Sequence, residues 1–109
     1  MIIIADDNRD QVDTLTDILE SDGYQVEGVY DGEQAIDLIN RYVRENIQID
    51  LVITDMYMPN ANGLDVAVAA KKAGAKKIII NSSDPTGIPP MEGVTIIDKS
   101  NLLEAVAKL

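Results

Sequence analysis

The chain of 109 residues contains no cysteine and no histidine, and 19 acidic residues against 9 basic ones give it a net charge of −10. This length suits one domain with a single core, predicted over residues 1–109. Imidazole catalysis, disulfides and zinc-thiolate sites are excluded, and the acidity argues against direct binding of nucleic acid through its phosphates. Proteins and hard cations are the expected partners.

No apolar run approaches the ~20 residues that a membrane span needs, so no membrane association is predicted. The chain begins with an apolar run from Met1 to Ile4, without the basic segment and small-residue cleavage site of a secretory signal. We therefore expect a cytoplasmic protein.

The first half of the chain predicts two strands, each followed by a helix. Residues 1–5 form a continuous apolar run, typical of a strand buried on both faces, and residues 9–21 carry apolar side chains at helical spacing. Residues 25–30 predict a second strand. Asp31 is expected to cap the second helix, with the Gln34 side chain reaching back to the helix start. The inner face of that helix is predicted to contain Ala35, Ile36, Ile39, Tyr42 and Val43.

The middle of the chain predicts another strand, helix and strand. Residues 51–54 are apolar or β-branched, and residues 64–73 have a helical pattern that ends at Gly74. Residues 77–81 contain three consecutive isoleucines and predict a fourth strand.

The last third departs from this regularity before returning to it. Residues 82–93 hold three prolines and two glycines, which exclude an ordinary helix. Residues 94–98 predict a fifth strand, and Asn101 with Glu104 is expected to cap a final helix through Leu109. Strands and helices thus alternate, which predicts an α/β protein with a mostly parallel sheet covered by helices on both faces.

Polar side chains stand at the carboxyl ends of four predicted strands: Asp6 and Asp7, Asp55, Ser82 and Ser83, and Lys99. Ligands of open parallel sheets bind at this edge. If the first and third strands are neighbours, ~4.8 Å apart, their three carboxylates share one small space. A cation would relieve the repulsion, and Mg²⁺ suits these oxygens together with the main-chain carbonyl of Tyr57.

Asp55 at a strand tip could then act as a nucleophile toward phosphorus. The groups predicted to hold the phosphoryl oxygens are the Ser82 hydroxyl, the amides of Met56 and Ser83 and the Lys99 ammonium. Each feature alone is common, because acidic pairs often begin loops or cap helices and a single lysine is usually exposed. Their placement at successive strand ends favours a phosphorylation site.

With these residues the whole chain resembles the receiver domain of bacterial two-component response regulators. The similar segments are "IIIADDN", "LVITDMYMPNANG", "IIINSS" and "IIDKS". The resemblance implies a flavodoxin-like (βα)5 three-layer sandwich with a five-stranded parallel sheet in the order 2-1-3-4-5. It also implies a sensor histidine kinase or phosphotransfer protein as phosphoryl donor, and a downstream protein partner.

Carried over by residue, the resemblance implies that Asp55 is the phosphoacceptor, Asp7 a direct Mg²⁺ ligand and Asp6 a ligand through water. Ser82 would be the switch hydroxyl that follows the phosphoryl group, and Lys99 its cationic partner. Tyr57 and Asp84 would lie at the mouth of the phosphoryl pocket.

Three positions depart from the family pattern. Ser100 follows Lys99 where the family has proline, Ile96 replaces the usual aromatic switch residue, and the prolines of residues 82–93 predict that the fourth helix is shortened or absent. We therefore expect any response to phosphorylation to pass through residues 82–93.

Two alternatives remain open. The altered output region is compatible with a receiver-fold interaction module or a phosphate sink whose output has degenerated. A Mg²⁺-dependent phosphohydrolase or a flavin carrier could also use this architecture. However, Tyr57 stands where such a hydrolase needs a second acid, and Asp6 and Asp7 would repel a flavin phosphate.

Overall fold

Five parallel strands form one sheet in the computed structural model, which describes residues 1–109. The strands are β1 (Ile2–Ala5), β2 (Val26–Val29), β3 (Leu51–Asp55), β4 (Lys77–Ser82) and β5 (Val94–Asp98). Their order in the sheet is β2-β1-β3-β4-β5, which confirms the predicted order. The sequence positions of all five strands are predicted to within two residues.

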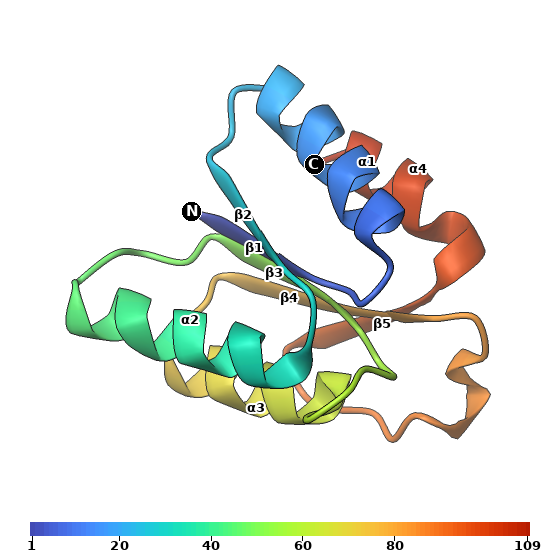
Figure 1. Cartoon of the computed structure of the whole chain (residues 1–109). Coiled ribbons are helices and arrows are strands. Elements are labelled where there is room, and N and C mark those ends of the chain that lie inside the picture. The colour runs from blue at the N-terminus through green and yellow to red at the C-terminus, as the bar shows by residue number, and fades with distance from the viewer.

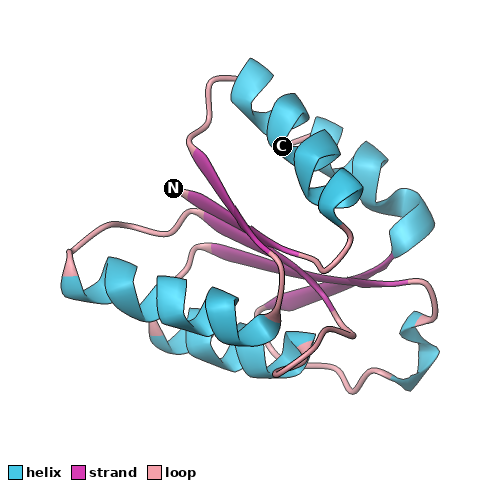
Figure 2. Ribbon diagram, viewed as in Figure 1, coloured by secondary structure: helices cyan, strands magenta, loops and turns pink.

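Four helices cover the two faces of the sheet (Figures 1 and 2). They are α1 (Arg9–Ser21), α2 (Gly32–Arg44), α3 (Gly63–Lys72) and α4 (Leu102–Ala107). Helices α1 and α4 lie on one face, and α2 and α3 lie on the other (Figure 1). The result is the predicted three-layer sandwich. None of these helices is long and apolar enough to cross a membrane.

The connection between β4 and β5 contains no α-helix, as its prolines predict. A single 3-10 turn, η1 (Pro85–Gly87), interrupts an extended segment at the edge of the molecule (Figure 2). Ile88 is buried within this segment and packs with the core on the α2/α3 side of the sheet. The segment therefore covers part of that face where a helix would otherwise lie.

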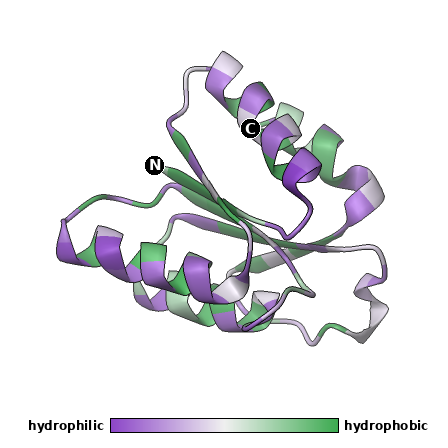
Figure 3. Ribbon diagram, viewed as in Figure 1, coloured by the Kyte–Doolittle hydropathy of each residue, from purple (hydrophilic) through white to green (hydrophobic).

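The sheet separates two apolar layers (Figure 3). Side chains alternate along each strand, so Ile3 and Val52 face α2 and α3, whereas Ile4 and Ile53 face α1 and α4. Both faces of the central strands are buried, which explains their continuous apolar sequence.

Of the two predicted helix caps, the structure confirms the one at Asp31 and contradicts the one at Asn101. Asp31 accepts a hydrogen bond from the Gln34 amide at 2.7 Å, and the Gln34 side chain reaches back to the Tyr30 amide at 2.9 Å. Asn101 makes no capping bond, so that prediction is wrong. The 3-10 turn η2 (Lys99–Asn101) precedes α4, and Asp98 caps this turn instead.

The inner face of α2 also differs from the prediction at two residues. Val43, which was predicted to face inward, is 50% exposed, and Leu38, which was not included, is buried. Helical spacing in the sequence did not resolve which residues border the buried stripe.

Helix α3 starts in close contact with the carboxyl end of β3. The Gly63 amide donates to the Met56 carbonyl at 2.8 Å, and a Cβ on Gly63 would lie 2.6 Å from the Asp55 carbonyl oxygen. Only glycine permits this approach, which holds the loop that follows Asp55.

Candidate functional site

The carboxyl ends of β1 and β3 bring three aspartates together. Ala5 pairs with Thr54 in the sheet, so the next residues, Asp6 and Asp55, lie side by side. Oxygen atoms of Asp6, Asp7 and Asp55 all lie within 4.8 Å of one another. Asp6 and Asp55 are buried and Asp7 is exposed, so the cluster opens to solvent on one side.

Asp6 is held firmly at one oxygen and left available at the other. Its Oδ1 accepts a hydrogen bond from the Asn8 amide at 2.9 Å. Its buried Oδ2 has no hydrogen-bond donor in suitable geometry, and the Lys99 ammonium lies 3.2 Å away as an ion-pair partner. A buried carboxylate oxygen with unused lone pairs, beside two further carboxylates, is a suitable donor set for a hard divalent cation.

Lys99 connects β5 to this acidic cluster. Its Nζ lies 3.2 Å from Asp6 Oδ2 and 3.4 Å from Asp55 Oδ2. Burial lowers the pKa of Lys99, but the charges and hydrogen bonds of the two aspartates outweigh burial, and the net effect is a raised pKa. The lysine therefore stays protonated and supplies one positive charge to the site.

Burial and the neighbouring charge of Asp6 raise the pKa of Asp55, and the Lys99 ammonium offsets this only in part. The site thus holds more negative charge than its single lysine balances. A bound cation would favour the ionised form of Asp55.

Ser82 ends β4, but its hydroxyl is engaged by the loop that follows. It accepts a hydrogen bond from the Asp84 amide at 3.1 Å and donates to the Asp84 carbonyl at 3.2 Å. Ser83 is exposed. The structure therefore places Ser82 at the predicted edge, with its hydroxyl paired to the loop.

The Met56 amide, predicted to bind phosphoryl oxygens, has a protein partner. It donates to the Asn81 carbonyl at 2.9 Å. Binding a phosphoryl group would require this hydrogen bond to be shared or exchanged. The adjacent Tyr57 is 63% exposed at the surface beside the cluster.

Ile96 and Ser100, the two positions near Lys99 that differ from the family pattern, both make defined contacts. Ile96 is half-buried and packs against the apolar layer under α2 and α3. The Ser100 amide and hydroxyl both donate to Asp98 Oδ1, at 2.9 and 2.8 Å. This turn shapes the backbone next to Lys99 without a proline, and the chain has no cis peptide bond.

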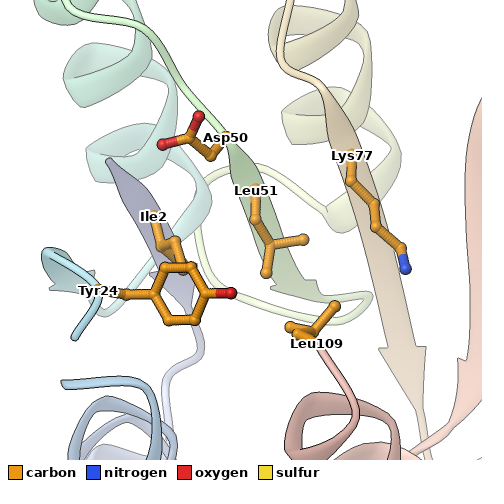
Figure 4. Close-up of a pocket in the computed structure, with 6 residues that line it drawn as sticks. All are labelled: Ile2, Tyr24, Asp50, Leu51, Lys77 and Leu109. Atoms are coloured by element: carbon orange, nitrogen blue, oxygen red, sulfur yellow. The ribbon is translucent and has the colours of Figure 1, made fainter. Parts of the chain in front are cut away.

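A shallow pocket of about 180 Å³ lies at the opposite edge of the sheet (Figure 4). It is lined by Ile2, Tyr24, Asp50, Leu51, Lys77 and Leu109. Because Ile2, Leu51 and Lys77 are the first residues of β1, β3 and β4, this pocket is separate from the acidic cluster at the carboxyl ends of the strands. The cluster itself is an open group of side chains rather than a cavity.

Asn81 also lies at the site, although the sequence alone suggested no role for it. It pairs with Asp55 across β3 and β4 and is 1% exposed. The signal in the sequence was a polar residue directly after three consecutive isoleucines in a buried strand.

The fold and the clustered aspartates define a class of proteins, the receiver domains of signalling systems. The family model described as "Response regulator receiver domain" matches residues 2–88. The chain therefore belongs to the response regulator receiver domain family and is a two-component signalling domain, not an enzyme of a classical kind.

Curated relatives and solved structures agree with this assignment. The transcriptional regulatory protein CpxR of Escherichia coli strain K12 is 34% identical over 79 residues, which cover 72% of this chain and 32% of CpxR. This chain thus spans about a third of the length of that relative.

Two solved receiver domains cover nearly the whole chain. The receiver domain of the hybrid histidine kinase CckA has a TM-score of 0.76 and 26% identity, covering 98% of this chain and 95% of that one. A CheY-like receiver domain protein from Methanospirillum hungatei JF-1 has a TM-score of 0.72 and 26% identity, covering 98% and 90%. The similarity in structure therefore extends past Ile88, where the family model ends, to include β5 and Lys99.

Proposed function

We propose that this domain accepts a phosphoryl group on Asp55 from a sensor histidine kinase or phosphotransfer protein in the cytoplasm. The supporting observation is the meeting of buried Asp55 with Asp6, Asp7 and Lys99 at the carboxyl edge of the sheet. A carboxylate at a strand tip, with an ammonium 3.4 Å away, is suited to nucleophilic attack on phosphorus.

In the proposed step a carboxylate oxygen of Asp55 forms a bond to phosphorus. The bond between phosphorus and the donor's leaving atom breaks, and that atom keeps the electron pair. The product is an acyl phosphate on Asp55. The Lys99 ammonium holds a phosphoryl oxygen, where it compensates charge that the transfer brings into the site.

The residues present fit Mg²⁺ as cofactor. Asp6, Asp7 and Asp55 would hold the ion, with the Tyr57 main-chain carbonyl as a further oxygen ligand. Asp6 Oδ2 has no hydrogen-bond donor, and the pKa of Asp55 is raised. Both observations indicate that the site has an excess of negative charge that a cation would neutralise. Bound Mg²⁺ supplies charge neutralisation for the phosphoryl oxygens.

Ser82 is proposed as the switch residue that links the phosphoryl group to the loop. Its hydroxyl cannot donate to a phosphoryl oxygen while it donates to the Asp84 carbonyl. Turning toward Asp55 would release Asp84 and loosen the segment up to Gly93. The Ser83 amide and the Met56 amide are the further proposed phosphoryl donors, the latter in exchange for its bond to Asn81.

The released segment would present the signal to a downstream protein partner. Lys71 on α3 donates a hydrogen bond to the Glu92 carbonyl and ties the far end of the segment to the body of the domain. The proposed moving part thus runs from Ser82 to Gly93, with the Lys71 contact near its far end. Ile96 stands at the family's switch position but has no aromatic ring to move.

A second candidate function is a receiver-fold module or phosphate sink whose partner does not sense phosphorylation. The observation that favours it is the absence of an α-helix between β4 and β5. Equal binding of a partner to phosphorylated protein and to Asp55→Asn would favour this alternative.

Intact-mass measurement after incubation with acetyl phosphate and Mg²⁺ tests the proposed function. The wild type is expected to gain one phosphoryl mass, and Asp55→Asn is expected to gain none. A folded wild type that binds Mg²⁺ and gains no mass would contradict the proposal.

A further inference from the structure

Asn81 is a buried polar residue near the end of β4 that the proposed chemistry does not use through its side chain. It is 1% exposed and lies between Ile80 and Ser82. Its Nδ2 donates to the Thr54 carbonyl at 3.1 Å, whereas its Oδ1 has no hydrogen-bond partner. A buried amide oxygen without a donor is destabilising, so its presence requires an explanation.

The Thr54 carbonyl determines which way the Asn81 amide faces. A carbonyl oxygen only accepts hydrogen bonds, so Nδ2 has to lie on its side. The reverse orientation would set two oxygens against each other. Oδ1 is therefore the group that Asn81 offers to other residues.

The strand register places Asn81 in one row with two aspartates. Asp6 follows β1 beside Asp55, and Asp55 pairs directly with Asn81. The residues two positions earlier in these strands all belong to the apolar layer under α1 and α4: Ile4, Ile53 and Ile79. Because side chains alternate along a strand, the three polar side chains share that face, with Asp55 in the middle.

Lys99 reaches the two aspartates across the end of β4. In the sheet β4 lies between β3 and β5, and Lys99 follows β5. An ammonium has three N–H donors. Lys99 donates a hydrogen bond to Asp55 Oδ2 and has Asp6 Oδ2 as an ion-pair partner. At least one ammonium donor and the Oδ1 of Asn81 thus remain without partners at the same edge of the sheet.

We propose that Asn81 is a positioning residue for Lys99: its Oδ1 is the third acceptor of the ammonium and holds Lys99 beside Asp55 during phosphoryl transfer. This inference rests on the proposed function of Asp55. In this proposal the long, rotatable Lys99 side chain moves its ammonium toward the Asn81 Oδ1, which has no partner in the structure. A neutral amide suits this role, because a third carboxylate in the row would repel an incoming phosphoryl group.

The kinetic test compares Asn81→Leu with the wild type at saturating Mg²⁺ and acetyl phosphate. Leucine has a similar volume but no acceptor, so phosphorylation is expected to be about tenfold slower, the worth of a hydrogen bond to a charged group. The dissociation constant for Mg²⁺ is expected to stay within about twofold, because Asp6, Asp7 and Asp55 are retained.

The same substitution in a Lys99→Met variant shows whether Asn81 acts by positioning Lys99 or only by packing in the core. In Lys99→Met, adding Asn81→Leu is expected to cause no further loss of rate, because Asn81 acts through the lysine. An equal fold-loss in both backgrounds would mean that Asn81 only supports the core, and would overturn the inference.

Nitrogen NMR of the Lys99 ammonium tests the contact in the unphosphorylated protein. Asn81→Leu is expected to move this signal more than Ile80→Val, a buried control on the opposite face of β4. An unmoved signal would overturn the contact. If the signal moves but the wild type accepts no phosphoryl group, the contact stands while the proposed function and the role of Asn81 in transfer both fail.

Asn81→Thr and Asn81→Val form a matched pair should the leucine variant not fold. The two side chains have the same shape and differ by one hydroxyl, which can accept from the ammonium. The threonine variant is expected to be phosphorylated faster, and equal rates would overturn the inference.

Discussion

Asp55 is buried beside a second carboxylate and one ammonium, and these surroundings determine its chemistry. Desolvation and Asp6 raise its pKa, while Lys99 opposes that shift. Asp6, which makes ionisation of Asp55 unfavourable, could bind a cation, and Lys99 could bind a phosphoryl group. If Asp55 is the phosphoacceptor as proposed, these surroundings lower the stability of the folded protein while they make the carboxylate reactive.

Replacing Lys99 with alanine is predicted to slow phosphorylation about a hundredfold, the typical loss when a donor to developing charge is removed. Mg²⁺ affinity should be equal or higher, because the ammonium that competes for Asp6 and Asp55 is gone. Rates from intact mass and calorimetric titration with Mg²⁺ measure the two effects. Lys108→Ala, which removes an exposed lysine on the surface, is the control, and weaker Mg²⁺ binding in Lys99→Ala would contradict the prediction.

Asp55→Asn is predicted to stabilise the Mg²⁺-free protein by about 1 kcal/mol at neutral pH. A carboxyl whose pKa is raised on folding destabilises the folded state once pH exceeds its unfolded pKa, so the gain should vanish as pH falls below the usual aspartate range. Urea unfolding with chelator, at neutral and acidic pH, measures this. Asp13→Asn, at an exposed position, should show no such gain. A gain for Asp55→Asn that grows toward acid pH would contradict the prediction.

The side chains of the cluster were predictable because each follows an apolar strand run, and parallel strands end at one edge. The hydrogen bonds at the site were not predictable from the sequence. Nothing in the sequence indicates that the Ser82 hydroxyl pairs with Asp84, or that the Met56 amide already donates to Asn81. Such choices depend on loop geometry, which single residues do not fix.

At the scale of elements, the segment from Ser82 to Gly93 replaces a helix with an extended chain and one 3-10 turn. Pro85, Pro89 and Pro90 lack the amides that a helix needs, so this outcome was predictable. The start of α4 was not predictable. The 3-10 turn η2 precedes this helix, and Asp98 caps that turn, whereas Asn101 makes no capping bond. A short turn before a helix leaves no distinct pattern in the sequence.

Amide exchange of residues 84–93 is predicted to change when beryllium fluoride and Mg²⁺ mimic the phosphoryl group. The Ser82 hydroxyl would leave Asp84 for the mimic, which frees the Asp84 amide and its neighbours. Exchange measured by mass spectrometry reports this directly. Ser82→Ala should abolish the difference between mimic-bound and free protein, and unchanged exchange in the wild type would argue against a signal through this segment.

In the molecule as a whole, a net charge of −10 and three carboxylates at one edge of the sheet mean that the proposed binding of a cation would add to stability. The fold class and strand order followed from the alternation of strands and helices together with the family resemblance. The buried face of each helix was less predictable, because helical spacing defines the edges of an apolar stripe only approximately. In α2, for example, Val43 is exposed and Leu38 is buried.

Mg²⁺ at a hundredfold excess over its dissociation constant is predicted to stabilise the fold by about 2.7 kcal/mol, since it binds the assembled edge and not the unfolded chain. Thermal or urea unfolding with Mg²⁺, against NaCl of equal ionic strength, measures the gain. Asp7→Asn, which removes an exposed ligand without disturbing the core, should lose most of it. An equal gain in this variant would place the stabilising ion elsewhere.

Reductive trapping with borohydride identifies which residue carries the phosphoryl group. An acyl phosphate on an aspartate is reduced to an alcohol, so peptide mass mapping after phosphorylation locates the modified residue. We expect a single trapped position, Asp55, in the wild type and none in Asp55→Asn. Trapping at another carboxylate, or at none in a protein that has gained phosphoryl mass, would contradict it.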